Sequence, residues 1–411
     1  MTSVRLTALL AGCVSLAAAG TAGAGGFSRG NADTDILFEE GNFNMRSSVT
    51  IVSPQREYKT ISSPLLGGTV AATDGTYSDG YAIPNIAIKL NLAEDLRCAG
   101  TYTQSFGSGA DYGTQATTAG LIDATGTMRE GFTSNEFGAT CGYKFDLAKG
   151  RVWLLGGGFL QDFDYSQTVR FSTPFPVPPL AGGTGTLSFR DEYQPGYRLG
   201  VAYEIPEIAL RAQLMYRSAV DHSPSGGSSD NFTARLPDGT VAGIAPTAGT
   251  GTLPQSVELK VQSGVAPGWL AFGSVKWTDW SVLDTLDYQI LAGPLAGPRQ
   301  LEYYFRDGWT VTGGIGHAFN ETISGSMGLS WDRGVSTTED ALTDTYTLFG
   351  GVALKDKLGG ELRFGGAVTY LTSGSVAADP TPLTPGPGNS FAYTVGNDWS
   401  YAASVAYAVN W

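Results

Sequence analysis

The chain has 411 residues, a formal net charge of −13 and only 15% charged residues. Soluble domains usually carry about 25% charged residues, so this composition argues against a soluble α/β enzyme. Glycine is frequent, at 57 residues, and aromatic residues make up 11% of the chain. The acidic balance and the lack of Lys/Arg runs argue against nucleic acid as a partner, because phosphate binding needs a basic stripe.

Residues 1–24 have the pattern of an export signal. Arg5 precedes a mostly small and apolar stretch, 6–19, and Ala22 and Ala24 offer a cleavage site of the A-x-A type. We therefore expect a secretory signal cleaved after Ala24. The alternative is a lipoprotein signal, because "LAGC" ending at Cys13 resembles a lipobox. The apolar stretch is too short to cross a membrane as a helix.

From residue 43 onward, apolar side chains recur at every second position. In "WSYAASVAYAVNW", residues 399–411, large apolar residues alternate with small or polar ones up to the terminal Trp411. In "TISGSMGLSWD", residues 322–332, Met327, Leu329 and Trp331 share one face, and Ser326, Gly328 and Ser330 share the other. Side chains alternate between the two faces of a strand, so this pattern predicts β-strands throughout.

Fourteen strands are expected in chain order. They lie near residues 43–54, 80–92, 96–107, 133–146, 150–171, 187–204, 208–222, 252–265, 269–291, 299–319, 322–335, 343–355, 360–376 and 392–411. Their connections alternate between short links, such as "AED" and "PEI", and long links, such as 108–132, 223–251 and "ADPTPLTPGPGN". Bacterial outer-membrane barrels have short periplasmic turns and long external loops, and an even strand number places both termini in the periplasm.

The expected strands are long, commonly ten or more residues, whereas strands of globular proteins usually have five or six. Their apolar faces carry aromatic residues near the ends, as the girdles of membrane barrels do. A closed barrel also satisfies every backbone polar group in lipid by pairing its last strand with its first. We therefore predict an all-β, transmembrane antiparallel β-barrel over residues 43–411, located in the outer membrane of a Gram-negative bacterium.

Three stretches, 196–218, 253–281 and 305–332, resemble the long-chain fatty-acid transporter (FadL-type) family of outer membranes. They read "GYRLGVAYEIPEIALRAQLMYRS", "LPQSVELKVQSGVAPGWLAFGSVKWTDWS" and "FRDGWTVTGGIGHAFNETISGSMGLSWD". The order of these blocks, the strand count and the loop alternation agree with the family from about residue 42 to the end. The resemblance implies a fourteen-stranded barrel with an inward-folded N-terminal plug. It also implies passive movement of hydrophobic molecules from the outer surface into the barrel wall.

The plug implied by this resemblance falls on residues 25–42, "GGFSRGNADTDILFEEGN". It is shorter than usual in the family and lacks the Asn-Pro-Ala signature, so the seal of the lumen and the substrate are both open. Asp35, Ile36, Leu37 and Phe38 form its acidic and apolar centre. They are interpreted as a gate held by basic residues of the lumen, and the alternative is a disordered N-terminal tail.

Two arginines beside aromatic residues are candidates for binding the head group of a carboxylate ligand. Arg170 precedes Phe171, and Arg306 follows Phe305 and lies near Trp309. An arginine fork can bind a carboxylate through two hydrogen bonds, and both positions match basic positions of the family's corresponding blocks. The alternative for each is a solvated or internally paired arginine, for example Arg306 with Asp307.

The aromatic sets Trp277/Trp280 and Tyr303/Tyr304/Phe305 have two interpretations. They either line an apolar groove or anchor the barrel at the membrane interface, and the second is favoured because Trp and Tyr prefer that interface.

A hydrolase site at the outer rim is a further, weaker alternative. It would use His222 with Ser218 or Ser223, but no third orienting group can be placed from the sequence.

Cys98 and Cys141 are expected on the lipid faces of adjacent strands, toward the periplasmic turns. Alternation places Cys98 with Leu96, Tyr102 and Phe106. A cross-strand disulfide is possible if their Cα atoms come within about 7 Å, and the alternative is two separate thiols. The Cys and His residues are too scattered for a zinc site, so we expect no metal and no cofactor.

The sequence thus predicts a non-enzymatic outer-membrane barrel for passive uptake of long-chain fatty acids or similar hydrophobic compounds. A general diffusion porin, favoured by the short plug, and an outer-membrane lipid hydrolase are the alternatives. The expected partners are the hydrophobic ligand, outer-membrane lipid and lipopolysaccharide, and the expected oligomeric state is a monomer.

Overall fold

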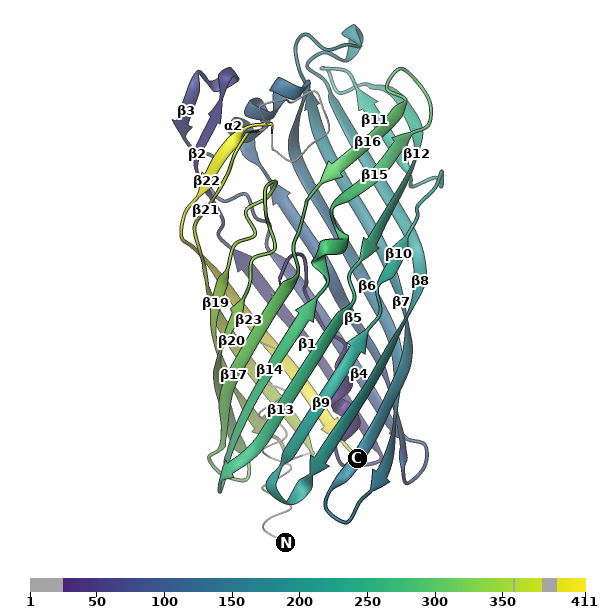
Figure 1. Cartoon of the computed structure of the whole chain (residues 1–411), viewed down its shortest axis with the longest axis vertical. Helices are drawn as coiled ribbons and strands as arrows, with labels where there is room; N and C mark the ends of the chain where they lie inside the picture. The colour runs from purple at the N-terminus through teal and green to yellow at the C-terminus, as the bar shows by residue number, and fades with distance from the viewer. Residues whose placement is uncertain (1–24, 358, 379–389) are drawn as a thin grey trace.

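The computed structural model describes residues 25–357, 359–378 and 390–411 (Figure 1). The expected export signal, the lipobox alternative and most of the Pro-rich link lie outside these residues. Within them, fourteen strands form the wall of a barrel. They are β1 (Phe43–Pro54), β4 (Tyr81–Asn91), β5 (Leu96–Asp111), β6 (Thr125–Asp146), β7 (Arg151–Phe171), β8 (Thr184–Ile205), β9 (Leu210–Arg217), β13 (Ser256–Ala266), β14 (Trp269–Thr278), β17 (Gly308–Ala318), β18 (Ile323–Asp332), β19 (Thr345–Lys355), β20 (Gly360–Leu371) and β23 (Asp398–Asn410).

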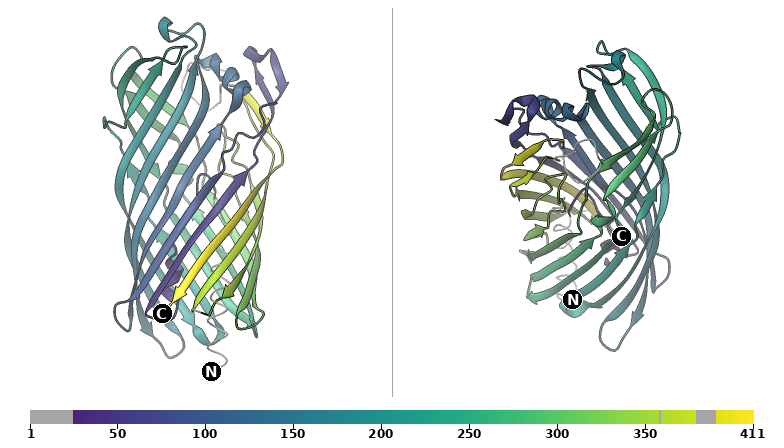
Figure 2. Two further views of the ribbon diagram at one scale, coloured as in Figure 1. Left: turned by 180° about the vertical axis from the view of Figure 1, so that it is seen from behind. Right: turned by 45° about the horizontal axis from the view of Figure 1, so that its top comes forward.

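The barrel closes because the last strand pairs with the first. β23 is antiparallel to β1 in a continuous register from Asn44–Asn410 to Pro54–Ser400. At the end of this seam the Phe43 and Trp411 rings stack with their centroids 5.4 Å apart. Every neighbouring pair in the wall is antiparallel, as Figures 1 and 2 show. The predicted closed barrel of fourteen antiparallel strands is therefore confirmed.

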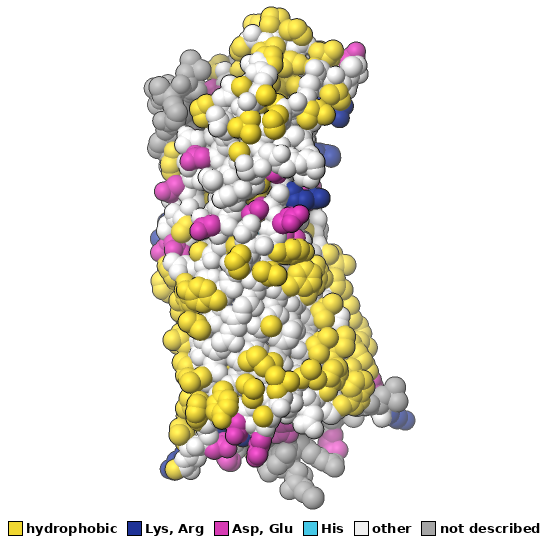
Figure 3. Space-filling model, turned by 90° about the vertical axis from the view of Figure 1, so that its right-hand side faces the viewer, with side chains coloured by type: hydrophobic (Ala, Val, Ile, Leu, Met, Phe, Trp, Pro, Cys, Tyr) yellow, Lys and Arg dark blue, Asp and Glu magenta, His cyan; other side chains and the backbone are white. Residues whose placement is uncertain are grey.

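The outer face of the wall carries a band of hydrophobic side chains, and charged side chains lie at its two edges (Figure 3). On β7 and β8 the exposed apolar residues run from Leu154 and Val201 to Leu160 and Tyr193. The opposite faces of the same strands point inward and include polar residues, such as the fully buried Gln161. This alternation is the one that lipid outside and a polar interior require. None of the described helices is long and apolar enough to cross a membrane.

Additional elements extend the barrel beyond the long-link end (Figure 1). A separate four-stranded sheet and the helix α2 (Gly113–Gly120) cover one side, and further strands and short 3₁₀ helices extend or connect the wall strands. The sheet is formed by β2 (Tyr58–Ser63), β3 (Gly68–Ala71), β21 (Gly374–Val376) and β22 (Ala392–Val395). The other elements at this end are β10 (Val220–His222), β11 (Asn231–Arg235), β12 (Val241–Leu253), β15 (Thr285–Ile290), β16 (Gly297–Glu302), η2 (Pro64–Leu66), η3 (Leu121–Asp123), η4 (Pro178–Leu180) and η6 (Trp280–Val282). At the opposite end, η5 (Pro206–Ile208) forms the short link between β8 and β9.

Several expected strand bounds were wrong at this outer end. The expected links 108–132 and 223–251 contain helix α2 and the paired strands β11 and β12. The expected single strand 269–291 is broken at η6, because its outer part leaves the wall. That part, β15, pairs with β12 and β16, whereas β14 pairs with β13 and β17. Continuous alternation in the sequence thus did not reveal the change of partner.

A β-bulge in β5 reverses one expected side-chain direction. The register with β6 shifts between Gln104 and Phe106, so two residues of β5 face one residue of its partner. One extra residue moves every later side chain to the other face of the sheet. Phe106 is therefore buried, at 6% exposure, and its ring lies 5.6 Å from that of Trp280. The expectation that Phe106 faces lipid with Cys98 was wrong.

Candidate ligand-binding site

Residues 27–30 of the N-terminal segment are hydrogen-bonded to β5 through the backbone. The amides of Arg29 and Gly30 donate to the carbonyl oxygens of Ser105 and Gln104, each at 2.9 Å. The amide of Gly107 donates to the Phe27 carbonyl oxygen, also at 2.9 Å. The segment therefore acts as a short additional strand beside β5.

The wall is interrupted at this level between β4 and β5. Their ladder runs from Asn91–Arg97 only as far as Asn85–Thr103. Contact between the two chain segments resumes where the Asp79 amide donates to the Gly109 carbonyl oxygen at 2.9 Å. Between these levels the backbone of β5 is paired with the N-terminal segment instead of with β4.

Arg29 and Gly30 fit tightly into this interruption. A Cβ atom added at Gly30 would lie 2.3 Å from Thr103 Oγ1 and 2.9 Å from Ile83 Cγ2, so only glycine allows this approach. The Arg29 guanidinium is buried over the Tyr81 ring, 4.1 Å from its centroid, and donates to Gln104 Oε1 at 2.5 Å. The gap in the ladder is thus filled by the N-terminal segment.

Farther along the segment, the 3₁₀ helix η1 (Thr34–Phe38) is buried among inward-facing wall residues. Ile36 and Leu37 are completely buried, and the Phe38 ring packs edge-on against Trp153 with centroids 5.7 Å apart. The Arg211 guanidinium covers Phe38, 4.4 Å from its centroid. In the structure these residues are therefore packed inside the barrel.

Ion pairs hold the acidic residues of the segment to the wall. Lys260 Nζ lies 3.2 Å from Asp35 Oδ2. Arg46 on β1 pairs with both Asp33, at 2.7 Å, and Glu39. The acidic residues around η1 are thus matched by basic residues of the lumen.

The part of the lumen that borders residues 28–34 is polar. Glu136 is buried and accepts hydrogen bonds from Arg198 and from Arg217, the latter at 2.8 Å to Nη2. Lys260 and Lys276 line the same cavity together with Ser28, Gly30 and Asn31. Such a surface suits water and ions, and burying an apolar molecule against it gives little hydrophobic stabilisation.

An apolar cavity lies on the other side of the N-terminal segment. Phe27 belongs to its wall and makes ring contacts of 5.2 Å with Phe132 and 5.8 Å with Tyr303. The cavity has a volume of about 50 Å³. Its other ring-bearing and aliphatic side chains are Phe163, Tyr165, Phe189, His222, Leu253, Leu283, Leu286, Tyr288 and Leu301. Its lining, mostly apolar with few polar groups, has the composition of small-molecule sites, but such sites usually have volumes of about 300–1,000 Å³, so a ligand has to widen this cavity.

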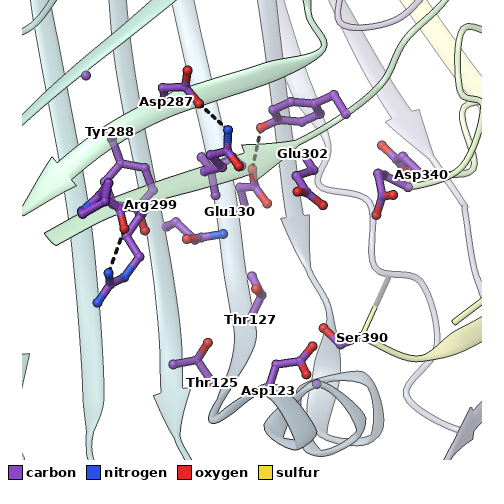
Figure 4. Close-up of a pocket in the computed structure, with 18 of the residues that line it drawn as sticks. Asp123, Thr125, Thr127, Glu130, Asp287, Tyr288, Arg299, Glu302, Asp340 and Ser390 are labelled. Carbon is purple, nitrogen blue, oxygen red and sulfur yellow. Dashed lines mark hydrogen bonds between the residues drawn. The ribbon is translucent and has the colours of Figure 1, made fainter. Parts of the chain in front are cut away.

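This cavity adjoins a wider, polar cavity of about 1470 Å³ at the outer end, and Tyr288, Leu301 and Tyr303 border both. Figure 4 shows the polar cavity, with Glu130, Asp287 and Asp340 on different elements around it. The hydroxyls of Tyr165 and Tyr303 each donate to Glu130 Oε1 at 3.0 Å. Its described lining has six acidic side chains, Asp123, Glu130, Asp287, Glu302, Glu339 and Asp340, and one basic side chain, Arg299.

His222 is the buried titratable group on the apolar cavity wall that the sequence singled out. Its Nδ1 lies 2.9 Å from Asp191 Oδ2, and the residue is only 3% exposed. Both residues lie beyond Tyr193 and thus outside the hydrophobic band. Burial lowers the pKa of His222, so the ring is neutral near pH 7.

The structure does not bring the five predicted ligand residues together. None of them lines the apolar cavity among the described residues. Phe171 and Phe305 are buried in the hydrophobic cluster that also contains Phe132 and Trp280, and these two contact Phe27. Arg170 is exposed on the face opposite to Phe171, and Arg306 is exposed, with its Nε donating to the Gly334 carbonyl oxygen at 2.9 Å.

Trp309 faces outward on β17, 40% exposed and directly opposite Trp277 on β14. This is the interface arrangement that the sequence favoured for the aromatic sets. Trp280 and Phe305, by contrast, are buried inside the barrel, at 0% and 3% exposure. The girdle interpretation was therefore wrong for these two and for Tyr303, which lines the apolar cavity. The chain turns inward at η6 for Trp280 and after β16 for Tyr303 and Phe305.

The structure does not assemble a hydrolytic triad around His222. Ser218 Oγ accepts a hydrogen bond from the Tyr197 amide at 3.0 Å, and the Ser223 amide donates to Asp191. His222 Nε2 is buried, and within the described residues it has no hydrogen-bond partner. A nucleophilic serine needs contact with such a base, so the serines are not activated here. Nor do the described residues include a cluster of Cys, His, Asp and Glu that could hold a metal ion.

Cys98 and Cys141 face each other directly on β5 and β6, with their Cα atoms 4.0 Å apart. The structure joins them in a disulfide that closes a sequence separation of 43 residues.

Phe27 and Asp191 are among the site residues that the sequence analysis missed. Phe27 carried a signal, because it is the lone aromatic residue in "GGFSRGNADTD".

A closed fourteen-stranded barrel with a buried N-terminal segment and an apolar cavity near its outer end defines a class of outer-membrane transport proteins. The sequence pattern of the outer membrane protein transport family (OMPP1/FadL/TodX) matches residues 36–342 of this chain. The chain belongs to this family. No curated protein matches it in sequence.

Solved structures of similar fold agree over nearly the whole chain. A Pseudomonas aeruginosa FadL homologue is 11% identical with a TM-score of 0.72, over 95% of this chain and 96% of the other. The Pseudomonas putida toluene transporter TodX is 14% identical, with a TM-score of 0.61 over 97% and 98%. The Ralstonia pickettii toluene transporter TbuX is 14% identical, with a TM-score of 0.60 over 96% and 97%. At these identities the likeness shows the fold.

Proposed function

We propose that this protein takes up neutral hydrophobic molecules passively through the outer membrane, by way of the apolar cavity. The observation that carries the proposal is the position of that cavity. It opens toward the outer end of the barrel and is bounded on the inner side by Phe27, with a charged lumen beyond. Entering the cavity lowers the free energy of a hydrophobic molecule, and moving on into the charged lumen raises it again.

The interruption between β4 and β5 offers such a molecule a way out of the cavity. The N-terminal segment fills this gap through Arg29 and Gly30, and Phe27 of the same segment borders the cavity. A shift of the segment would therefore change the cavity and the wall together. We expect the cargo to leave sideways into lipid, where an apolar molecule is more stable than in water.

The charges around the outer cavity favour a neutral cargo over a fatty-acid anion. In the described lining, acidic side chains outnumber the one basic side chain, Arg299, and this charge disfavours the approach of a carboxylate. Burial raises the pKa of Glu130 and of Asp340, so the other four acidic side chains contribute most of that charge. Arg170 and Arg306 line neither the apolar cavity nor the polar one. Two of the similar structures are of toluene transporters, and toluene is neutral.

Residues 33–40 would keep the lumen closed to small solutes during this transport. Asp33, Asp35 and Glu39 are held by basic side chains of the wall, so the segment is tied down on several sides. This supports a plug and weighs against a general diffusion porin. Lipid and lipopolysaccharide would surround the hydrophobic band, and the proposed oligomeric state is a monomer.

Substitution of Phe27 tests the proposal. Phe27→Asp places a charge in the apolar cavity, and Phe27→Leu keeps the site apolar as the matched control. We expect the first variant to bind a neutral alkylbenzene at least about tenfold more weakly than the native protein, and the second to stay within about threefold. Equal binding by all three proteins, or no binding by any of them together with free ion conductance, would contradict the proposed function.

A further inference from the structure

We propose that His222 Nε2 accepts a hydrogen bond from a hydroxyl group of the cargo, so that the protein prefers hydrophobic phenols or alcohols to bare hydrocarbons. This inference rests on the proposed function, because it takes the apolar cavity as the binding site. It adds a polar specificity group to a site that is otherwise defined by its apolar surface.

The orientation of the His222 ring is fixed by its contact with Asp191. Asp191 Oδ2 lies 2.9 Å from Nδ1 of the ring and also accepts from the Ser223 amide at 3.2 Å. Its other oxygen accepts from Gln194 Nε2 at 3.2 Å. A carboxylate in contact with Nδ1 favours the tautomer that carries the proton there. Nε2 is then left with a lone pair, and it can accept a hydrogen bond but not donate one.

That lone pair has no partner in the protein. Nε2 is buried, and within residues 25–357, 359–378 and 390–411 no group forms a hydrogen bond with it. A buried acceptor without a partner is costly, so a ligand that supplies a donor gains more than one that does not. The surroundings are aromatic, since His222 packs against Phe163 with ring centroids 5.5 Å apart.

Several other polar groups of the cavity are already engaged. The hydroxyls of Tyr165 and Tyr303 donate to Glu130, and Asp287 accepts a hydrogen bond from Gln300 at 3.0 Å. His222 also borders the cavity, and its Nε2 is left without a partner; because this atom is buried, the ring or its neighbours must shift for a cargo hydroxyl to reach it. The aromatic walls formed by Phe132, Phe163 and Phe189 suit an aromatic ring carrying that hydroxyl.

The test compares three ligands of equal chain length with the purified full-length protein in one detergent. They are 4-octylphenol, 4-octylanisole, which keeps the oxygen but lacks the donor, and octylbenzene. Each affinity is corrected for the partition of that ligand into protein-free micelles. We expect the native protein to bind the phenol about five- to tenfold more tightly than either of the other two.

His222→Phe keeps a ring at this place and removes the acceptor. We expect this variant to retain octylbenzene binding and to lose the preference for the phenol. The matched control is His317→Phe, because His317 is the other histidine of the chain and lies in β17, stacked on Trp269. The control should keep the preference. The comparison of the three ligands on the native protein holds even if His222→Phe folds poorly.

The outcomes separate this inference from the proposed function. Equal native affinities for the three ligands, or a preference that survives His222→Phe, would overturn the role of His222 while transport of hydrophobic compounds stands. If none of the three ligands binds the native protein, the proposed function fails, and the inference fails with it.

Discussion

Lys260 and Asp35 lie 3.2 Å apart, and their contact links β13 of the wall to the 3₁₀ helix inside the barrel. The Asp35 side chain is 8% exposed, and Arg211 lies 4.0 Å from its other oxygen. A carboxylate that faces two basic groups at this depth holds the N-terminal segment to the barrel wall.

Asp35→Asn should loosen this segment and raise ion conductance. Removing one partner of a buried ion pair costs about 3–5 kcal/mol, and the partial exposure of Lys260 places the expected loss at the lower end. The measurement is single-channel conductance in planar bilayers. Glu94→Gln, an exposed site in a short turn, is the control and should conduct like the native protein. Unchanged conductance of Asp35→Asn would mean that the ion pair does not keep the lumen closed.

A cross-link between the N-terminal segment and β5 should block uptake in a reversible way. Ser28→Cys with Phe106→Cys places two thiols on residues that face each other as an antiparallel bridge pair and line the same cavity. Cys98→Ser and Cys141→Ser in the same protein prevent wrong pairing. We expect oxidation to stop the uptake of a labelled alkylbenzene by cells that express this variant, and reductant to restore it.

Each single cysteine variant, in the same serine background, controls for the effect of the substitution itself. Uptake that continues at the native rate in the oxidised double variant would show that the cargo leaves by another route.

The bond between Cys98 and Cys141 should protect both residues from alkylation. Denatured protein that has not been reduced should take up no label at either residue, and reduced protein should take up two, as mass spectrometry of peptides can show. Cys98→Ser with Cys141→Ser should lower the free energy of unfolding by about 2–4 kcal/mol, because the bond constrains the unfolded chain. Full labelling of both residues without reduction would rule the bond out.

Arg306→Ala tests whether an arginine binds a carboxylate cargo, as the sequence suggested. Because the side chain is exposed and bonded to the Gly334 carbonyl oxygen, we expect less than about a twofold change in the binding of a long-chain fatty acid. Arg170→Ala should behave in the same way. The measurement compares the fatty acid with a hydrocarbon of equal length in one detergent. A selective loss of affinity of about tenfold or more for the acid would show that the arginine does bind the carboxylate.

The sequence by itself determined the barrel. Its apolar residues repeat with the period of a strand, and lipid accepts such strands only in a closed sheet, so fourteen segments and an apolar outer face followed directly. Trp411 at the end of the last alternation already marked the seam that β1 and β23 close. The apolar and acidic centre of the N-terminal segment, Ile36 and Leu37 beside Asp35, likewise indicated a place inside the barrel.

Only the tertiary structure decided which side chains meet inside the barrel. The bulge before Phe106 turned that ring inward, and the turn at η6 did the same for Trp280. Asp191 and His222 meet across 31 positions of sequence, and Phe27 meets Tyr303, which lies much farther along the chain. Alternation indicates the face of the strand on which a side chain lies, but register, bulges and strand bends determine which residues it contacts. These depend on the pairing of the whole sheet, which no local stretch of sequence contains.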